Sequence, residues 1–295
     1  MFELLGIPPQ ALFGQLLLGL INGAFYALLS LGLAVIFGLL NVINFAHGAQ
    51  YMLGAFVAWG IANTLGLGYW WALLAAPVAV GAFGMVLERL LLRRLYSVDH
   101  LYGLLLTFGI ATIIEGVFRQ RFGSSGQPYS IPPELEGGHN LGFMFLPNYR
   151  AWVVGASLTL CLATWFLIER TRLGSYLRAA TENPKLVQAF GINVPRMILL
   201  TYGLGVGLAA LAGVMAAPIY QLSPLMGTNL IVVVFAVVVI GGMGSILGSI
   251  VTGFGLGVVE GFTKVFYPEA SNTVIFVIMA IVLLLKPAGL FGQAR

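Results

Sequence analysis

Charged residues are scarce in this sequence of 295 residues. Asp, Glu, Lys and Arg make up 8% of it, whereas a soluble domain carries about a quarter charged residues. The apolar set AVILMFWYC contributes 59%. No water-soluble core could bury so much apolar surface, so the composition excludes a soluble globular protein and indicates a chain that lies in a lipid bilayer.

Several chemical signatures are also absent from the sequence. Cys161 is the only cysteine, which excludes an internal disulfide and a cysteine metal cluster. The sequence contains no GxxxxGK[ST] phosphate-binding loop, no HExxH zinc helix and no GxSxG nucleophile motif. We therefore expect no catalytic residue, no metal, no cofactor and no ATP-hydrolysing motor in this chain.

Apolar runs of ~20 residues recur along the chain, and this is the length that a helix needs to cross the bilayer. They lie near residues 11–39, 44–62, 70–92, 101–118, 151–168, 197–217, 229–247, 249–264 and 273–286. We predict an all-α, polytopic transmembrane bundle of about eight to nine spans, which forms a single membrane domain over residues 1–295. The segment Asn41–Ala58, which contains NVINFAHG, is either a turn between two spans or a broken, re-entrant helix.

The basic residues predict the orientation, because Lys and Arg in short loops stay on the cytoplasmic side. Three groups fall on that side if the N-terminus lies outside: Arg89, Arg93 and Arg94, then the loop 169–196, then Lys286 and Arg295. The segment 119–150 lands on the opposite side. The beginning, MFELLGIPPQ, lacks the basic region of a cleaved signal, so we expect no processing.

Three acidic side chains lie near predicted span ends, at Glu88, Glu115 and Glu260. Glu115 precedes Arg119 by one helical turn and Glu260 precedes Lys264 in the same way, so each pair can meet on one helix face. Paired residues at the membrane surface are the favoured interpretation. The alternative is a proton-coupled carrier that uses Glu115, Glu260 or His47.

Amides and an imidazole interrupt the apolar N-terminal third at Asn22, Asn41, Asn44, His47 and Gln50. Unsatisfied polar groups are costly in hydrocarbon, so these side chains are expected to face protein or water. They either line a solute pathway or hydrogen-bond the backbone of a broken helix and hold its shape.

Glycines stand four residues apart in two sets in the C-terminal third, at Gly244 and Gly248 and at Gly253, Gly257 and Gly261. This small-xxx-small spacing lets membrane helices approach closely. We predict that these glycines pack helices together, within the subunit or against a partner.

The loop 169–196 is the most informative polar stretch. Helix-forming residues fill Ser175–Ala189, and Pro184 interrupts them, so two short helices at the membrane surface are predicted. Gly191 suits the end of the second helix. Taken alone, the loop is more typical of an ordinary amphipathic linker than of a docking element.

The sequence contains GLINGAFYALLSLGLAVIFGLLNVINFAHGAQYMLGAF, RAATENPKLVQAFGINVPRMILLTYGLGVGLAALAGVMAAP and VVVIGGMGSILGSIVTGFGLGVVEG, in this order. Together these stretches resemble branched-chain amino acid ABC permeases of the LivH type. One departure concerns the residues after NFAHG, where many members of that family have an acidic residue but Ala49 and Gln50 follow Gly48 here. This departure weakens any transfer of substrate identity.

The resemblance implies that the loop is a coupling helix inserted into a groove of an ATPase subunit. The residues implied to form the seat are Ala179, Ala180, Pro184, Ala189, Gly191 and Ile192. The implied partners are a second homologous permease, two cytoplasmic ATPases that bind ATP and Mg, and an extracytoplasmic solute-binding protein, in a bacterial inner membrane. The implied solute is a branched-chain or other hydrophobic amino acid; the alternative is urea, a short amide or another small solute.

Overall fold

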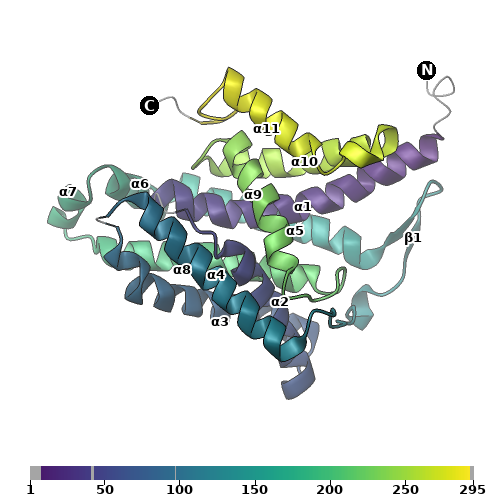
Figure 1. Ribbon diagram of the computed structural model, residues 1–295, viewed down its shortest axis with the longest axis horizontal. Coiled ribbons are helices and arrows are strands. Elements are labelled where there is room, and N and C mark those ends of the chain that lie inside the picture. Colours follow the sequence, from purple (N-terminus) through teal and green to yellow (C-terminus); the bar gives the residue numbers. More distant parts are fainter. Residues whose placement is uncertain (1–7, 41–42, 97, 293–295) are drawn as a thin grey trace. The chain divides into compact units, whose positions relative to one another are not determined.

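The computed structural model describes residues 8–40, 43–96 and 98–292 (Figure 1). Every predicted apolar run falls on a helix: α1 (Pro9–Leu40), α2 (His47–Leu65), α3 (Tyr69–Leu90), α4 (His100–Phe122), α5 (Asn148–Arg170), α8 (Val194–Ala216), α9 (Met226–Gly241), α10 (Ile246–Phe266) and α11 (Val274–Leu285). Between α5 and α8 lie the short helices α6 (Arg172–Glu182) and α7 (Pro184–Ala189). Single 3-10 turns occur at Leu92–Arg94, Pro133–Leu135 and Pro268–Ala270.

Within the described part of the chain, six helices are long and apolar enough to cross a membrane, judged by length and composition. They are Pro9–Gly38, Tyr69–Arg94, His100–Phe122, Asn148–Arg170, Val194–Ala216 and Ile246–Phe266. The apolar helices α9 and α11 are shorter, with 16 and 12 residues. The polytopic helical fold is thus confirmed, whereas the count of eight to nine spans stays a prediction.

The chain divides into two compact units. The first contains Met1–Ser30, Ile131–Cys161 and Val233–Arg295, and the second contains Leu31–Ser130 and Leu162–Val232. Because α1, α5 and α9 each contribute residues to both, the units share helices and are not joined by a linker.

In the first unit, glycines bring α10 against the N-terminal part of α1. A Cβ on Gly253 would lie 2.5 Å from the backbone nitrogen of Ala27. A Cβ on Gly257 would overlap the backbone of Gly19 and of Gly23. Because higher numbers on α10 meet lower numbers on α1, the two helices run antiparallel, and only residues without a side chain permit such close approach.

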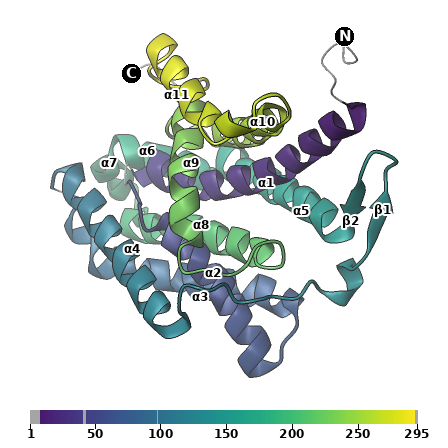
Figure 2. The same cartoon turned by 45° about the vertical axis from the view of Figure 1, so that its right-hand side comes forward.

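The first unit also holds an apolar cluster and a hairpin. The cluster joins α9, α10 and α11 through Ala236, Val237, Ile240, Leu256 and Ile275, and Figure 2 shows α10 and α11 together. The strands β1 (Gly138–Asn140) and β2 (Phe145–Pro147) pair antiparallel, with His139 opposite Leu146.

In the second unit, α8 packs on both α2 and α3. A Cβ on Gly213 of α8 would overlap the carbonyl oxygen of Tyr51 on α2. A Cβ on Gly84 of α3 would lie 2.8 Å from the side chain of Val206 on α8. By contrast, α4 exposes Leu101, Leu105, Phe108, Ile113 and Val117. Small residues therefore pack the interior, while large apolar residues of α4 face outward, as hydrocarbon surroundings allow.

Polar side chains fix several helix ends in both units. Asp99 accepts a hydrogen bond from the Leu101 backbone nitrogen at the start of α4, at 2.9 Å. Ser245 accepts one from the Gly248 nitrogen at the start of α10, at 3.0 Å. Each bond satisfies a backbone donor that has no partner within the helix, and so sets where the helix begins.

Candidate functional site

The loop between α5 and α8 folds as the sequence predicts, into two short helices separated at Pro184. Asn183 ends α6, and its side chain also accepts a hydrogen bond from the Leu186 nitrogen at 3.0 Å, which caps α7. Gly191 follows α7 with φ of 81°, a left-handed conformation that glycine adopts without strain. The break in the loop therefore has a local cause, since the proline and the asparagine cap act on adjacent residues.

The two short helices bury one face and expose the other. Leu177 and Val187 are buried, whereas Leu186 is 54% exposed and Phe190 is 77% exposed. These side chains lie among the charged and polar residues of a surface loop rather than within one of the long apolar helices. Large apolar side chains exposed in a polar loop are typical of a docking site.

The residues predicted to seat the ATPase lie at this surface. Ala179, Pro184, Ala189 and Gly191 are exposed. Ala180 and Ile192 are partly buried. Phe190 was not among the predicted residues, although its place four residues after Leu186 is a signal in the sequence, because two apolar side chains at that spacing share one helical face.

A second candidate site is the polar turn between α1 and α2. Asn44 donates to Gln50 Oε1 at 3.0 Å, and Gln50 donates to the Tyr202 hydroxyl of α8 at 3.5 Å. All three side chains are buried. His47 is buried as well, and a Cβ added to Gly32 would lie 3.0 Å from its ring.

The same turn is also fixed to α4. The backbone nitrogen of Phe45 donates to the Thr107 hydroxyl at 3.1 Å, and that hydroxyl lies 3.3 Å from the carbonyl oxygen of Ile43. Of the other predicted polar residues, Asn22 is partly buried on the part of α1 that belongs to the first unit. Asn41 lies outside the described residues.

The three acidic residues have different surroundings. Lys264 forms an ion pair with Glu260, as predicted, and the Tyr26 hydroxyl donates to the other oxygen of this carboxylate at 2.7 Å. Glu115 and Arg119 are both described and form no ion pair, so that prediction is wrong. One helical turn of spacing permits a pair but does not enforce it, since such a pair contributes little.

Glu88 is buried and accepts a hydrogen bond from the Tyr96 hydroxyl at 3.0 Å. Tyr96 follows the end of the long apolar helix Tyr69–Arg94. Burial, together with the nearby Glu88 carboxyl, raises the pKa of the Tyr96 hydroxyl, which therefore keeps its proton and donates it to this bond. Glu88 is thus buried and held by a hydrogen bond rather than exposed at the surface.

The predicted packing glycines fall into two groups. Gly248, Gly253, Gly257 and Gly261 are buried on α10, and a Cβ on Gly248 would overlap Gly241. Gly244 lies in the turn between α9 and α10 with φ of 92°, a left-handed conformation that accounts for glycine at this position.

These features describe a multi-pass helical membrane protein that presents a structured apolar patch on one polar loop. The sequence profile of the family described as "Branched-chain amino acid transport system / permease component" matches residues 15–283. The chain therefore belongs to this family of transport permeases, and the resemblance seen in the sequence is confirmed.

Curated relatives match along nearly the whole chain. The chain is 30% identical over 294 residues to the "High-affinity branched-chain amino acid transport system permease protein LivH" of Escherichia coli strain K12, with 95% of each chain covered. The same identity and coverage relate it to the corresponding permease BraD of Pseudomonas aeruginosa. The "Probable branched-chain amino acid transport permease protein LivH" of Methanocaldococcus jannaschii is 26% identical over 285 residues, which cover 90% of this chain and 88% of the relative.

Proposed function

We propose that this chain forms half of the translocation pathway of a bacterial ABC importer for branched-chain or other hydrophobic amino acids, in the inner membrane. A second homologous permease completes the pathway, and an extracytoplasmic binding protein delivers the solute. Two cytoplasmic ATPase subunits bind ATP and Mg and supply the energy, while this chain binds no cofactor. The family and the names of its relatives support the solute class and the transport role.

The observation that carries the coupling role is the exposed apolar patch formed by Leu186 and Phe190, with 54% and 77% of their surfaces exposed. The predicted orientation places this patch in the cytoplasm, where water would otherwise surround it. An ATPase groove that covers both side chains would remove this apolar surface from water, which is favourable in proportion to the area buried. Closure of the ATPase pair on ATP would then pull on the loop and tilt the attached spans.

The polar turn takes a supporting role in this proposal. Asn44, Gln50 and Tyr202 hydrogen-bond one another inside the second unit, and Thr107 holds the backbone at Phe45. We therefore assign these side chains to fixing the connection between α1 and α2, rather than to binding the solute. A carrier driven by protons through His47 is disfavoured by the same arrangement, because the imidazole is packed against the backbone of α1.

The test uses the complex purified from its native membranes through a tag on this chain. It is reconstituted in proteoliposomes with the cognate binding protein, and uptake of labelled leucine, isoleucine and valine is measured with and without ATP. We expect uptake only with ATP and binding protein, and none under a pH gradient alone. Uptake by this chain without any ATPase would refute the ABC mechanism, and stimulation by urea or short amides alone would refute the amino-acid assignment.

A further inference from the structure

The junction between α5 and α6 is unusually close. A single residue, Thr171, separates the two helices, and its φ of −113° and ψ of 165° turn the chain sharply. A Cβ added to Gly174 would overlap the carbonyl oxygen of Ile168. The first turn of α6 therefore rests directly on the last turn of α5, and glycine is what permits this approach.

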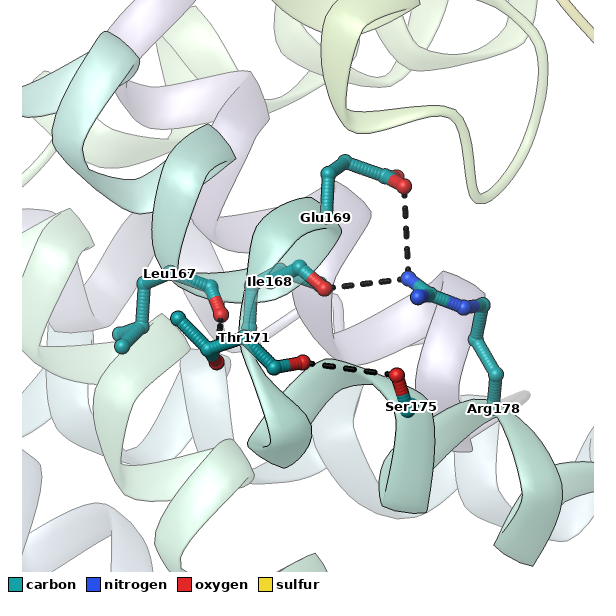
Figure 3. A network of polar contacts seen from close by, with 6 residues as sticks. All are labelled: Leu167, Ile168, Glu169, Thr171, Ser175 and Arg178. Atoms are coloured by element: carbon teal, nitrogen blue, oxygen red, sulfur yellow. Dashed lines mark hydrogen bonds and ion pairs between the residues drawn. The ribbon is translucent and has the colours of Figure 1, made fainter.

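Side chains that follow α5 also hydrogen-bond to the last turn of α5. The Arg178 guanidinium donates to the carbonyl oxygen of Ile168 at 3.0 Å and to Glu169 Oε2 at 3.3 Å, so Arg178 reaches back from α6 to the end of α5 (Figure 3). The Thr171 hydroxyl donates to the carbonyl oxygen of Leu167. The last carbonyls of a helix have no partner within it, and here two of them are satisfied by side chains of the following segment.

The bond to the carbonyl is the stronger part of this contact. Arg178 and Glu169 are both well exposed, with 44% and 41% of their side chains accessible, and exposed ion pairs contribute little. The bond to Ile168 is partly buried, carries the charge of the guanidinium and lies at the negative end of the α5 dipole. Loss of Arg178 should therefore weaken the junction far more than loss of Glu169.

The opposite end of the loop is built differently. Phe190, Gly191, Ile192 and Asn193 separate α7 from α8, and a Cβ on Gly191 would meet no atom within 4 Å. Asn193 accepts a hydrogen bond from the Arg196 nitrogen at 3.1 Å, which fixes the start of α8. Backbone bonds from the Gly191 nitrogen to Gln188 at 2.9 Å and from the Val194 nitrogen to Ile192 at 3.0 Å order the residues between. The α7–α8 connection is therefore held by backbone hydrogen bonds around a glycine, whereas the α5–α6 connection is closed by a guanidinium.

From these contacts we propose that Arg178 is a positioning residue that fixes α6 to α5, so that displacement of the loop passes to α5 as one rigid body. The proposal rests on the proposed function only in taking the loop as the part that an ATPase displaces. Arg178 itself contacts neither the solute nor the ATP, and acts through the orientation of α6.

The first experiment measures coupling in the purified complex. Arg178→Gln removes the charge and most of the reach, Arg178→Lys keeps the charge, and Arg172→Gln is the matched control because Arg172 lies on the same helix but makes neither bond. ATP hydrolysis and solute uptake are measured in the same proteoliposomes. For Arg178→Gln we expect uptake per ATP to fall about tenfold, the loss typical of removing a hydrogen bond to a charged group.

Arg178→Lys should recover at least part of the uptake per ATP, and Arg172→Gln should match the unaltered complex. A normal ratio of uptake to hydrolysis in Arg178→Gln overturns the proposal. If the unaltered complex itself shows no uptake that depends on ATP, the proposed function fails instead, so the two failures are distinguishable.

A second measurement does not require the ATPase. Cys161→Ala removes the only cysteine, and spin labels are placed at the exposed positions Leu162 on α5 and Glu182 on α6. We expect one narrow distance distribution in the parent and in Arg172→Gln, and a distribution at least twice as broad in Arg178→Gln. Equal widths in all three would contradict the role of Arg178 in fixing the junction, even where the variant no longer assembles with its partners.

Discussion

The apolar surfaces of α4 and α7 are alike in exposure but differ in what surrounds them. Ile113 on α4 is 67% exposed and Phe190 beside α7 is 77% exposed. Ile113 lies within a 23-residue apolar helix, where hydrocarbon covers such side chains without cost. Phe190 follows a six-residue helix in a polar loop, where the proposed ATPase groove would cover it. The proposal thus assigns exposed apolar area to lipid in one region and to a protein partner in the other.

The largest effect is expected when a carboxylate is placed on the exposed face of α4. Ile113→Asp places a charge near the middle of a span, which costs about 3 kcal/mol by insertion scales. We expect the yield of folded protein in the membrane to fall roughly tenfold or more. This yield is measured as the amount of detergent-solubilised protein that stays monodisperse, with Ile113→Leu as the control. A normal yield of Ile113→Asp would show that this face of α4 is not in contact with hydrocarbon.

The same substitution at the other surface should have a different result. Phe190→Asp leaves membrane insertion unchanged, because the side chain lies in a polar loop outside the spans. It removes an aromatic anchor whose burial contributes about 2 kcal/mol, so the ATPase should bind roughly 30-fold more weakly. Titration of the purified ATPase against the permease in nanodiscs measures the affinity. Unaltered affinity would exclude Phe190 from the seat.

Gly191→Arg tests the backbone at the same surface. No atom lies within 4 Å of a Cβ there, so the Cβ itself meets no clash, but φ of 81° strains any L-residue with a side chain by about 1–2 kcal/mol. We expect insertion to persist and ATP-driven uptake to be lost. Gly191→Asn is the control, since asparagine tolerates the left-handed region and should keep most of the uptake. Normal uptake in Gly191→Arg would show that Gly191 has no role in coupling.

Composition and local pattern were enough to predict the helices and the break in the loop. Long apolar runs can satisfy their backbone in hydrocarbon only as helices, and Pro184 acts on its nearest neighbours, so neither inference needed distant contacts. The glycine spacing on α10 indicated close packing for the same reason, because positions four apart share one face. Gly244 shows the limit, since its spacing is identical but a turn at residues 242–245 removes it from that face.

The polar turn shows what the sequence could not reveal. Gln50 meets Tyr202 across 152 positions, and Phe45 meets Thr107 across 62. No local pattern specifies such pairs, because they depend on which helices pack together. Arg178 was likewise visible only as one more basic residue of the loop, because its partner is a backbone carbonyl, and every residue carries one.

The smallest expected effect comes from truncating one exposed leucine to alanine on each of the two surfaces. Leu105 on α4 is 63% exposed and Leu186 on α7 is 54% exposed, so truncation of either to alanine removes a similar accessible area. In lipid the loss is nearly neutral, because hydrocarbon fills the space, and Leu105→Ala should leave both stability and ATPase affinity unchanged. At the docking surface the lost burial amounts to ~1 kcal/mol, so Leu186→Ala should weaken ATPase binding about fivefold. Equal affinities for the two variants would mean that α7 carries no more of the interface than a lipid-facing helix does.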